Sequence, residues 1–256
     1  MRYSLLAGGK RLRPILAILA YEAAGGLAYE EIMPAACALE YVHTFTLIHD
    51  DLPAMDNDDY RRGKLSNHKK FGEGMAILAG DGLMIDGLGL VCHSGAPCKY
   101  VVRALKEFTE ILGSSGVTLG QADDLYGGEA NAKFLRHIHM RKTALFISFS
   151  IRIGAILGRA EEATLSELHR AGVLAGMGFQ IMDDILDVRS SLKDLGKTPG
   201  KDSEDNKLTY PSVYGLEYSE RMAKGYARRA KRIFSNLGEK WNTLSLFTDH
   251  LVMRNK

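Results

Sequence analysis

The sequence has little cysteine, little net charge and no long apolar run. Three cysteines in 256 residues, without the spacing of zinc ligands, predict reduced thiols in the core and a reducing compartment. The net charge of +2, from 33 basic and 31 acidic residues, gives no global reason to expect a nucleic-acid partner. No stretch long enough to span a membrane is free of Asp, Glu, Arg and Lys, so we expect a cytoplasmic protein with no membrane span.

The spacing of the apolar residues predicts an all-α fold. They recur every three or four residues, alternating β-branched runs are few, and 46% hydrophobic residues suffice for one large core. We therefore expect a single domain over 1–256. Glycine and proline breaks place the helices near 14–24, 31–52, 73–91, 99–113, 117–127, 132–157, 164–187, 209–215, 218–236 and 240–253.

Two aspartate motifs, at residues 50–56 and 183–187, end two of the most apolar predicted helices. Two unit charges about 4 Å apart repel by roughly 4 kcal/mol at an effective dielectric of 20, so clustered carboxylates need cations among them. Oxygen ligands without His or Cys favour magnesium or manganese, which bind diphosphates well. The candidate metal ligands are Asp50, Asp51, Asp56, Asp183, Asp184 and Asp187.

The two motifs bring their carboxylates together in different ways. Asp183 and Asp187 are four residues apart, so they lie on one face of a continuous helix. Asp50 and Asp56 are six apart, about 240° around a helix, and converge only if the helix ends between them. Pro53 is expected to supply that break.

Cations occur at the places where a diphosphate would need them. The candidates are Lys10, Arg11 and Arg13 before a helix start, Arg61 and Arg62 after the first motif, Lys142 before an apolar run, and Lys197 and Lys201 after the second motif. Each also has a simpler interpretation: a solvated basic turn for the first group, an ion-pair network for the arginine pair, and surface lysines for the last two.

Five segments together, at 8–14 (GGKRLRP), 43–63 (HTFTLIHDDLPAMDNDDYRRG), 78–83 (LAGDGL), 178–187 (GFQIMDDILD) and 207–211 (KLTYP), resemble the trans-polyprenyl diphosphate synthases. They are most similar to the bacterial farnesyl diphosphate synthases. The resemblance runs almost end to end, in order and spacing, although the chain has only seven residues before the first segment, where family members usually have another helix.

The resemblance implies an isoprenoid synthase-type bundle of antiparallel helices around a central cavity, usually in a homodimer, with three magnesium ions. The aspartates would hold the ions. The resemblance places the diphosphate of the allylic substrate on Arg61, Lys142 and Lys197, and isopentenyl diphosphate on Lys10, Arg13, His43 and Arg62.

The implied reaction is transfer of an allylic group to isopentenyl diphosphate. Ionisation of the allylic C–O bond gives a carbocation, and the Lys142 carbonyl, the Thr143 hydroxyl and the Gln180 amide oxygen resemble the groups that face it. Phe45 and Thr46, one turn before Asp50, resemble the residues that limit product length, with Met75, Met84 and Ile85 as further candidates. An aromatic ring at 45 predicts the fifteen-carbon farnesyl product; a twenty-carbon product and a non-catalytic regulatory subunit are the alternatives.

A terpene cyclase of the same fold is disfavoured because it would lack the isopentenyl-binding set. A di-metal oxidase bundle is disfavoured because it would need paired Glu-x-x-His ligands. No serine, cysteine and histidine constellation predicts hydrolysis.

Overall fold

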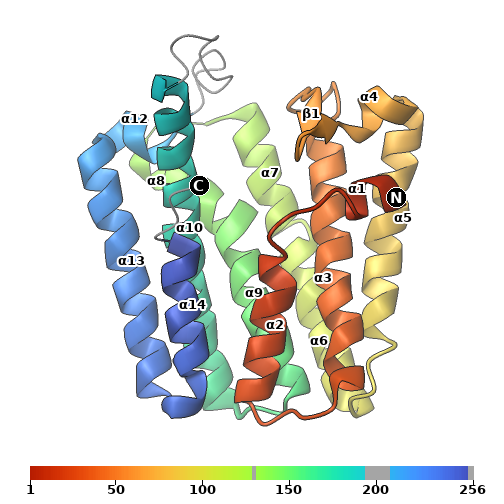
Figure 1. The fold of residues 1–256 in the computed structure, drawn as a ribbon, viewed down its shortest axis with the longest axis vertical. Helices are drawn as coiled ribbons and strands as arrows, with labels where there is room; N and C mark the ends of the chain where they lie inside the picture. Colours follow the sequence, from red (N-terminus) through yellow and green to blue (C-terminus); the bar gives the residue numbers. More distant parts are fainter. Residues whose placement is uncertain (129–130, 194–207, 253–256) are drawn as a thin grey trace. The chain divides into compact units, whose positions relative to one another are not determined.

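The computed structural model describes residues 1–128, 131–193 and 208–252, and their regular secondary structure is helical apart from one short hairpin (Figure 1). The chain divides into two compact units, residues 1–109 with 150–160 and residues 110–149 with 161–256. The prediction of one domain stays a prediction, and the two units are described separately below.

The first unit is built on α3, which packs against α2 on one side and α5 on another. Ile32, Leu39 and Val42 of α3 are fully buried there. Close approach needs a glycine at one point: a Cβ on Gly154 of α9 would lie 1.9 Å from the carbonyl oxygen of Ala17 in α2. The elements of this unit are α1 (Arg2–Leu5), α2 (Leu12–Ala23), α3 (Tyr29–Asp50), β1 (Tyr60–Arg61), β2 (Lys64–Leu65), α4 (Asn67–Phe71), α5 (Glu73–Val91) and most of α6 (Cys98–Leu112).

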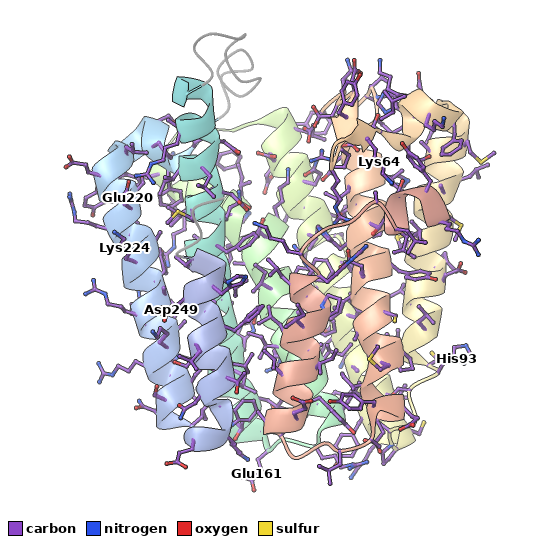
Figure 2. The ribbon with its side chains drawn as sticks, viewed as in Figure 1. Lys64, His93, Glu161, Glu220, Lys224 and Asp249 are labelled. Atoms are coloured by element: carbon purple, nitrogen blue, oxygen red, sulfur yellow. The ribbon has the colours of Figure 1, made fainter. Side chains whose placement is uncertain are left out.

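The second unit is built on α10, which packs against α13 and α14. Phe234 and Trp241 are fully buried in it, while Glu220 and Lys224 extend from the charged face of α13 (Figure 2). Its elements are α7 (Val117–Tyr126), α8 (Ala132–His139), a π-helical turn η1 (Met140–Ala144), the start of α9 (Leu145–Leu157), α10 (Glu162–Lys193), α12 (Tyr210–Tyr214), α13 (Leu216–Asn236), a short 3₁₀ turn η2 (Glu239–Trp241) and α14 (Asn242–Val252).

The structure confirms the predicted helices in kind and corrects three expectations. The expected helix at 132–157 is interrupted by the π-helical turn η1. Elements α1, α4 and the β1–β2 hairpin were not predicted, because they are too short to carry a periodic apolar pattern. The cysteines are free but exposed, so the expectation of core thiols was wrong.

Helix α5 is strongly apolar, with Glu73, Asp81 and Asp86 as its charged residues. Among the described residues it is the one helix that is long and apolar enough to cross a membrane by length and composition, and 33% of its apolar window is buried. Ala76, Leu83 and Val91 on its buried face are 0% exposed. Leu78 and Ile85 on the opposite face are 65% and 63% exposed. One face of α5 is therefore core, and the other is an exposed apolar surface.

Candidate active site

The first aspartate motif follows the end of α3. The helix ends at Asp50, three residues before Pro53, and the chain turns back so that the N–H of Asp56 donates to the carbonyl oxygen of Asp50 at 2.8 Å. A second backbone bond, from Asn57 to Leu52 at 3.1 Å, closes the same turn. The predicted break before Pro53 is confirmed, and it brings Asp50 and Asp56 close along the backbone.

The carboxylate of Asp51 points inward, with 2% of the residue exposed. Arg61 of β1 donates to it from Nε at 2.9 Å and from a second guanidinium nitrogen, and donates to Asp58 at 3.0 Å. Burial raises the pKa of Asp51, and the hydrogen bonds and charge of Arg61 oppose that rise. Arg61 thus neutralises the buried charge of Asp51, as the ion-pair interpretation of this arginine predicts.

Replacing Arg61 by Ala is expected to lower the melting temperature by roughly 6–12 °C. The change leaves a buried carboxylate without its charged partner, which costs on the order of 3 kcal/mol. Lys69→Ala is the matched control, because Lys69 pairs with Asp59 at 2.9 Å where both side chains are exposed. Thermal unfolding by circular dichroism measures both, and equal shifts would contradict the structural role of Arg61.

The β1–β2 hairpin carries the two arginines. Its two-residue turn is made by Arg62 and Gly63, both with positive φ (55° and 73°), which suits the twist of a hairpin. The Arg62 guanidinium donates to the carbonyl oxygen of Gly8 at 2.6 Å and lies 3.6 Å from Glu40. The hairpin is therefore attached to the glycine-rich segment before α2.

His43 of α3 lies within electrostatic reach of four arginines. Burial lowers its pKa well below the usual value, and the charges of Arg13, Arg62, Arg61 and Arg11 lower it further. A neutral ring near several guanidinium groups fits a site for an anionic ligand. The structure therefore brings together three of the four residues expected to bind isopentenyl diphosphate, while the fourth, Lys10, is an exposed residue of the adjoining segment.

Arg11, one of the candidate cations before α2, belongs to this cluster, and so does Glu40, which was not predicted as a site residue. Arg11 pairs with Glu40 and donates to the carbonyl oxygen of Leu5 at 2.7 Å. Glu40 is 7% exposed. The available signal was that Glu40 is the only charge in the apolar part of α3.

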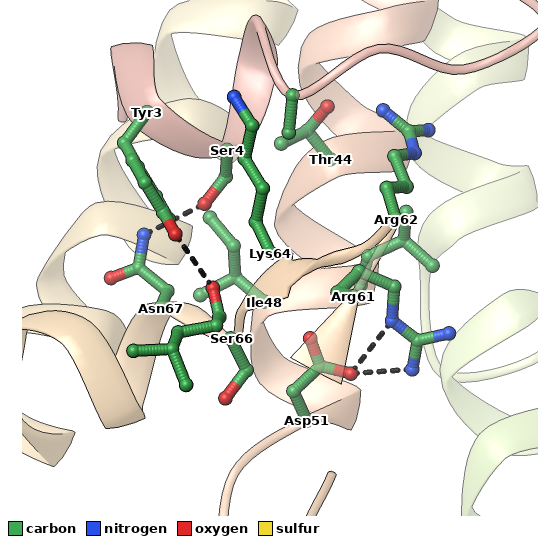
Figure 3. A pocket seen from close by; sticks show the side chains of 13 residues that line it. Tyr3, Ser4, Thr44, Ile48, Asp51, Arg61, Arg62, Lys64, Ser66 and Asn67 are labelled. Carbon is green, nitrogen blue, oxygen red and sulfur yellow. Dashed lines mark hydrogen bonds and ion pairs between the residues drawn. The ribbon is translucent and has the colours of Figure 1, made fainter. Parts of the chain in front are cut away.

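A small cleft beside this cluster is lined by α1, α3 and the hairpin (Figure 3). Tyr3 donates to the carbonyl oxygen of Leu65 at 2.9 Å, and Asn67 donates to Ser4 at 2.8 Å across it. Its volume of about 20 Å³ suits about one water molecule, so the cleft itself does not hold a prenyl diphosphate. Its walls instead hold Asp51, Arg61 and Arg62 in place.

The second aspartate motif lies within α10, and its three carboxylates do not share a face. Asp183 is half-buried and Asp187 is exposed, on the same side of the helix as their spacing predicts. Asp184 is 6% exposed and accepts a hydrogen bond from the backbone N–H of Tyr210 at 2.9 Å. Burial raises the pKa of Asp184 to about 7, against the effect of that N–H and of the Gln180 amide.

The turn η1 carries Lys142 and Thr143, and glycines allow two helices to approach it. A Cβ on Gly120 of α7 would lie 2.4 Å from the backbone nitrogen of Lys142, and one on Gly176 of α10 would lie 2.6 Å from Cα of Ala144. This packing places the Thr143 hydroxyl 2.7 Å from Gln180 Oε1, to which it donates. A π-helical turn often marks a functional site, and here it positions two of the predicted groups side by side.

Lys142 has a partner that the sequence did not indicate. Its ammonium lies 2.5 Å from Asp124 of α7. His139, one turn before Lys142, stacks on Tyr210 with ring centroids 5.1 Å apart, and burial lowers its pKa to about 4, so the ring is neutral. Asp124 and His139 lacked any motif that would have distinguished them from surface residues.

The carboxylates of the aspartate motifs are oxygen ligands of the kind that magnesium prefers. Within the described ranges, no three side chains of His, Cys, Asp or Glu lie close enough to form a complete protein cage for a metal. Magnesium commonly takes only one or two carboxylates, and water and phosphate oxygens complete its shell. The carboxylates of each motif supply oxygen ligands for that mode of binding, and His139 Nε2 lies 3.5 Å from Asp184 Oδ2 in the second motif.

The residues expected to limit product length lie on α3. Phe45 packs against the cluster of Ile48, Ala76, Ala79 and Leu83, so its ring lies between α3 and α5. The Thr46 hydroxyl donates to the carbonyl oxygen of His43 at 2.9 Å. Met75 and Ile85 are 55% and 63% exposed on the outer side of α5, so they do not line an enclosed cavity of the first unit as expected. Lys197 and Lys201 lie outside the described residues.

A family model described as polyprenyl synthetase matches residues 1–240. The chain belongs to this family. It is 43% identical to a dimethylallyltranstransferase of Fischerella ambigua (99% of this chain, 75% of the relative) and 46% identical to the large subunit 1 of a heterodimeric chloroplast geranylgeranyl pyrophosphate synthase of Arabidopsis thaliana (90% and 64%). The chain thus spans between about two thirds and three quarters of these relatives.

Solved structures agree with the family. A geranyltransferase of Helicobacter pylori, crystallised with magnesium and isoprenyl diphosphate, has a TM-score of 0.86 and 30% identity, and the match covers 98% of this chain and 85% of that one. The all-α isoprenoid synthase fold is confirmed. The chain is a member of a family of trans-prenyltransferases.

Proposed function

We propose that this chain condenses an allylic diphosphate, dimethylallyl or geranyl, with isopentenyl diphosphate. The observation that carries the proposal is that the charges of Arg11, Arg13, Arg61 and Arg62 all act on His43, a residue of the same helix that ends at Asp50. A cationic site beside a carboxylate site suits two diphosphates, one held directly and one through magnesium.

Each aspartate motif supplies magnesium ligands in our proposal. Asp50, Asp51 and Asp56 from one motif, and Asp183 and Asp187 from the other, are the proposed magnesium ligands. Magnesium, with manganese as a substitute, supplies neutralisation of the charge that grows on the leaving diphosphate. The number of ions, expected to be three, belongs to the proposal.

The basic groups exchange partners when substrate binds. Arg61 leaves Asp51, and Lys142 leaves Asp124, to donate to the allylic diphosphate. Lys197 is a further proposed ligand of the same group. Because Arg61 and Lys142 each have an acidic partner before binding, neither is left as an isolated charge in the substrate-free protein.

The chemistry then needs no protein nucleophile. The allylic C–O bond breaks with its electrons on the diphosphate, the isopentenyl double bond attacks the allylic carbon, and a proton leaves the product, with the released diphosphate as its acceptor. The oxygens of Thr143 and Gln180, hydrogen-bonded at 2.7 Å, stabilise the allylic cation.

The product length is proposed as twenty carbons. This rests on the relatives named geranylgeranyl pyrophosphate synthase, which are 44–47% identical to the chain. The fifteen-carbon farnesyl product is the second candidate, favoured by the aromatic ring at Phe45. A regulatory subunit is disfavoured, because no residue of either aspartate motif is replaced.

Turnover assays test the proposal. The full chain is incubated with magnesium, geranyl diphosphate and labelled isopentenyl diphosphate, and the dephosphorylated products are separated by chromatography. A prenyl alcohol of twenty carbons is expected; a fifteen-carbon peak would support the second candidate. Folded protein that gives no labelled prenyl product would overturn the proposed activity.

We also propose that the outer face of α5 is the interface of a homodimer. Leu78, Ile85 and Met75 give this face exposed apolar side chains, and a helix that is apolar all round is usually buried. A second copy of the chain presents the same self-complementary face, as a two-fold interface requires.

The pair of substitutions Leu78→Arg and Ile85→Arg is expected to convert the dimer to monomer. Two buried arginines would face their own copies across the two-fold axis, where like charges repel. Sedimentation velocity measures the mass. The control is Arg at Val102, a 59% exposed apolar residue of α6; an unchanged mass in the α5 variant would contradict the interface.

A further inference from the structure

Both carboxylate oxygens of Asp184 are occupied by hydrogen bonds inside the second unit. Oδ2 accepts from the backbone N–H of Tyr210 at 2.9 Å, and Oδ1 accepts from the Gln180 side-chain amide at 3.2 Å. The residue is 6% exposed, whereas Asp183 beside it in the motif is half-buried and Asp187 is exposed. Asp184 therefore faces the protein interior, away from the side of α10 that carries the other two aspartates.

These bonds determine the orientation of the Gln180 amide. An ionised Asp184 only accepts hydrogen bonds, so the end of the amide that faces it is the NH₂ group. The amide oxygen then faces Thr143, whose hydroxyl donates to it at 2.7 Å. While Asp184 is ionised, the hydrogen-bond network thus favours this amide orientation over the flipped one.

The orientation matters for the proposed reaction. The amide oxygen is the negative end of the side-chain dipole, and it stabilises a cation, while the NH₂ group would repel one. A glutamine without a fixed partner could turn either end toward the substrate. A fixed acceptor behind it removes the unfavourable arrangement before substrate binds.

We propose that Asp184 is a positioning residue that holds the Gln180 amide with its oxygen toward the allylic cation, and that it is not a magnesium ligand. The inference rests on the proposed function and changes the role of one residue within it. It separates the two neighbouring aspartates: Asp183 binds metal, and Asp184 orients a side chain that faces the substrate. Tyr210 fixes the carboxylate from its other side, so the start of α12 is attached to the same group.

The substitution Asp184→Asn tests this orientation directly. The backbone N–H of Tyr210 only donates, so the oxygen of the new asparagine faces it and the new NH₂ group faces Gln180. That NH₂ group needs an acceptor, so the Gln180 amide turns its oxygen toward it and away from Thr143. We expect kcat to fall about 100-fold, as when one oriented dipole is lost. The KM values of the substrates should stay within about two-fold of wild type. The same holds for the magnesium concentration that gives half-maximal binding of a non-ionising thio analogue of geranyl diphosphate.

A double substitution makes the test specific. In Asp184→Asn with Gln180→Glu, the glutamate accepts from the new NH₂ group and again presents an oxygen to Thr143, and the total charge is unchanged. We expect kcat to recover at least about 10-fold relative to Asp184→Asn. Gln180→Glu alone, which sets two carboxylates against each other, should not show this recovery.

Asp183→Asn is the matched control for metal binding, since it should raise the magnesium concentration needed for binding of the analogue. If Asp184→Asn raises it equally, or if the double substitution recovers no activity while its melting temperature matches that of Asp184→Asn, the positioning role is overturned. An inactive wild-type protein would instead overturn the proposed function, which separates the two failures.

Discussion

Asp183→Ala is expected to lower turnover by about 100- to 1000-fold. The carboxylate is a proposed magnesium ligand on the side of α10 that also carries Asp187, and losing one such electrostatic contact to the leaving group costs about 3–4 kcal/mol. The side chain is only half-buried, so the fold should survive its truncation. Turnover is measured with saturating substrates, and the fold by thermal unfolding.

Glu167→Ala is the control for Asp183→Ala. Glu167 lies on the same helix and pairs with Arg170 at 2.6 Å, an exposed pair of small energetic value. Its turnover should stay within two-fold of wild type. Unchanged turnover in Asp183→Ala, with a matching melting temperature, would contradict the metal role of Asp183.

Phe45→Ala is expected to lengthen the main product by at least one five-carbon unit. The ring occupies space between α3 and α5, one turn before the first aspartate motif, and its removal leaves room for a longer chain. The direction holds whether the wild-type product has fifteen or twenty carbons. Chromatography of the dephosphorylated products, with excess isopentenyl diphosphate, measures the distribution.

Leu83→Ala separates product control from packing. Leu83 is 0% exposed in the same apolar cluster, so its loss should destabilise the protein by about 2–5 kcal/mol, a cost like that of a core truncation. Its product distribution should match that of wild type. If both variants lose stability and neither changes the product, Phe45 is only a core residue.

The local geometry of the aspartate motifs could be predicted from the sequence. Pro53 predicts that α3 ends before it, and the helix ends at Asp50. The spacing of Asp183 and Asp187 predicts a shared helix face. Both inferences depend only on backbone rules that act over a few residues.

The partners of the second aspartate in each pair could not be predicted. Asp51 is held by Arg61 ten residues later, and Asp184 by Tyr210, which is 26 residues away. Which of two adjacent aspartates turns inward depends on the elements that pack there. The same holds for the turn η1, because the approach of Gly120 and Gly176 to it is a tertiary contact.

The central claim is that each aspartate motif binds magnesium that the allylic diphosphate needs. Calorimetric titration of the protein with the non-ionising thio analogue of geranyl diphosphate tests it most directly. We predict one analogue bound per chain with magnesium, with binding at least about 100-fold weaker in EDTA and in each of Asp50→Ala and Asp183→Ala. Tight binding in EDTA, or in either variant with magnesium, would contradict the claim.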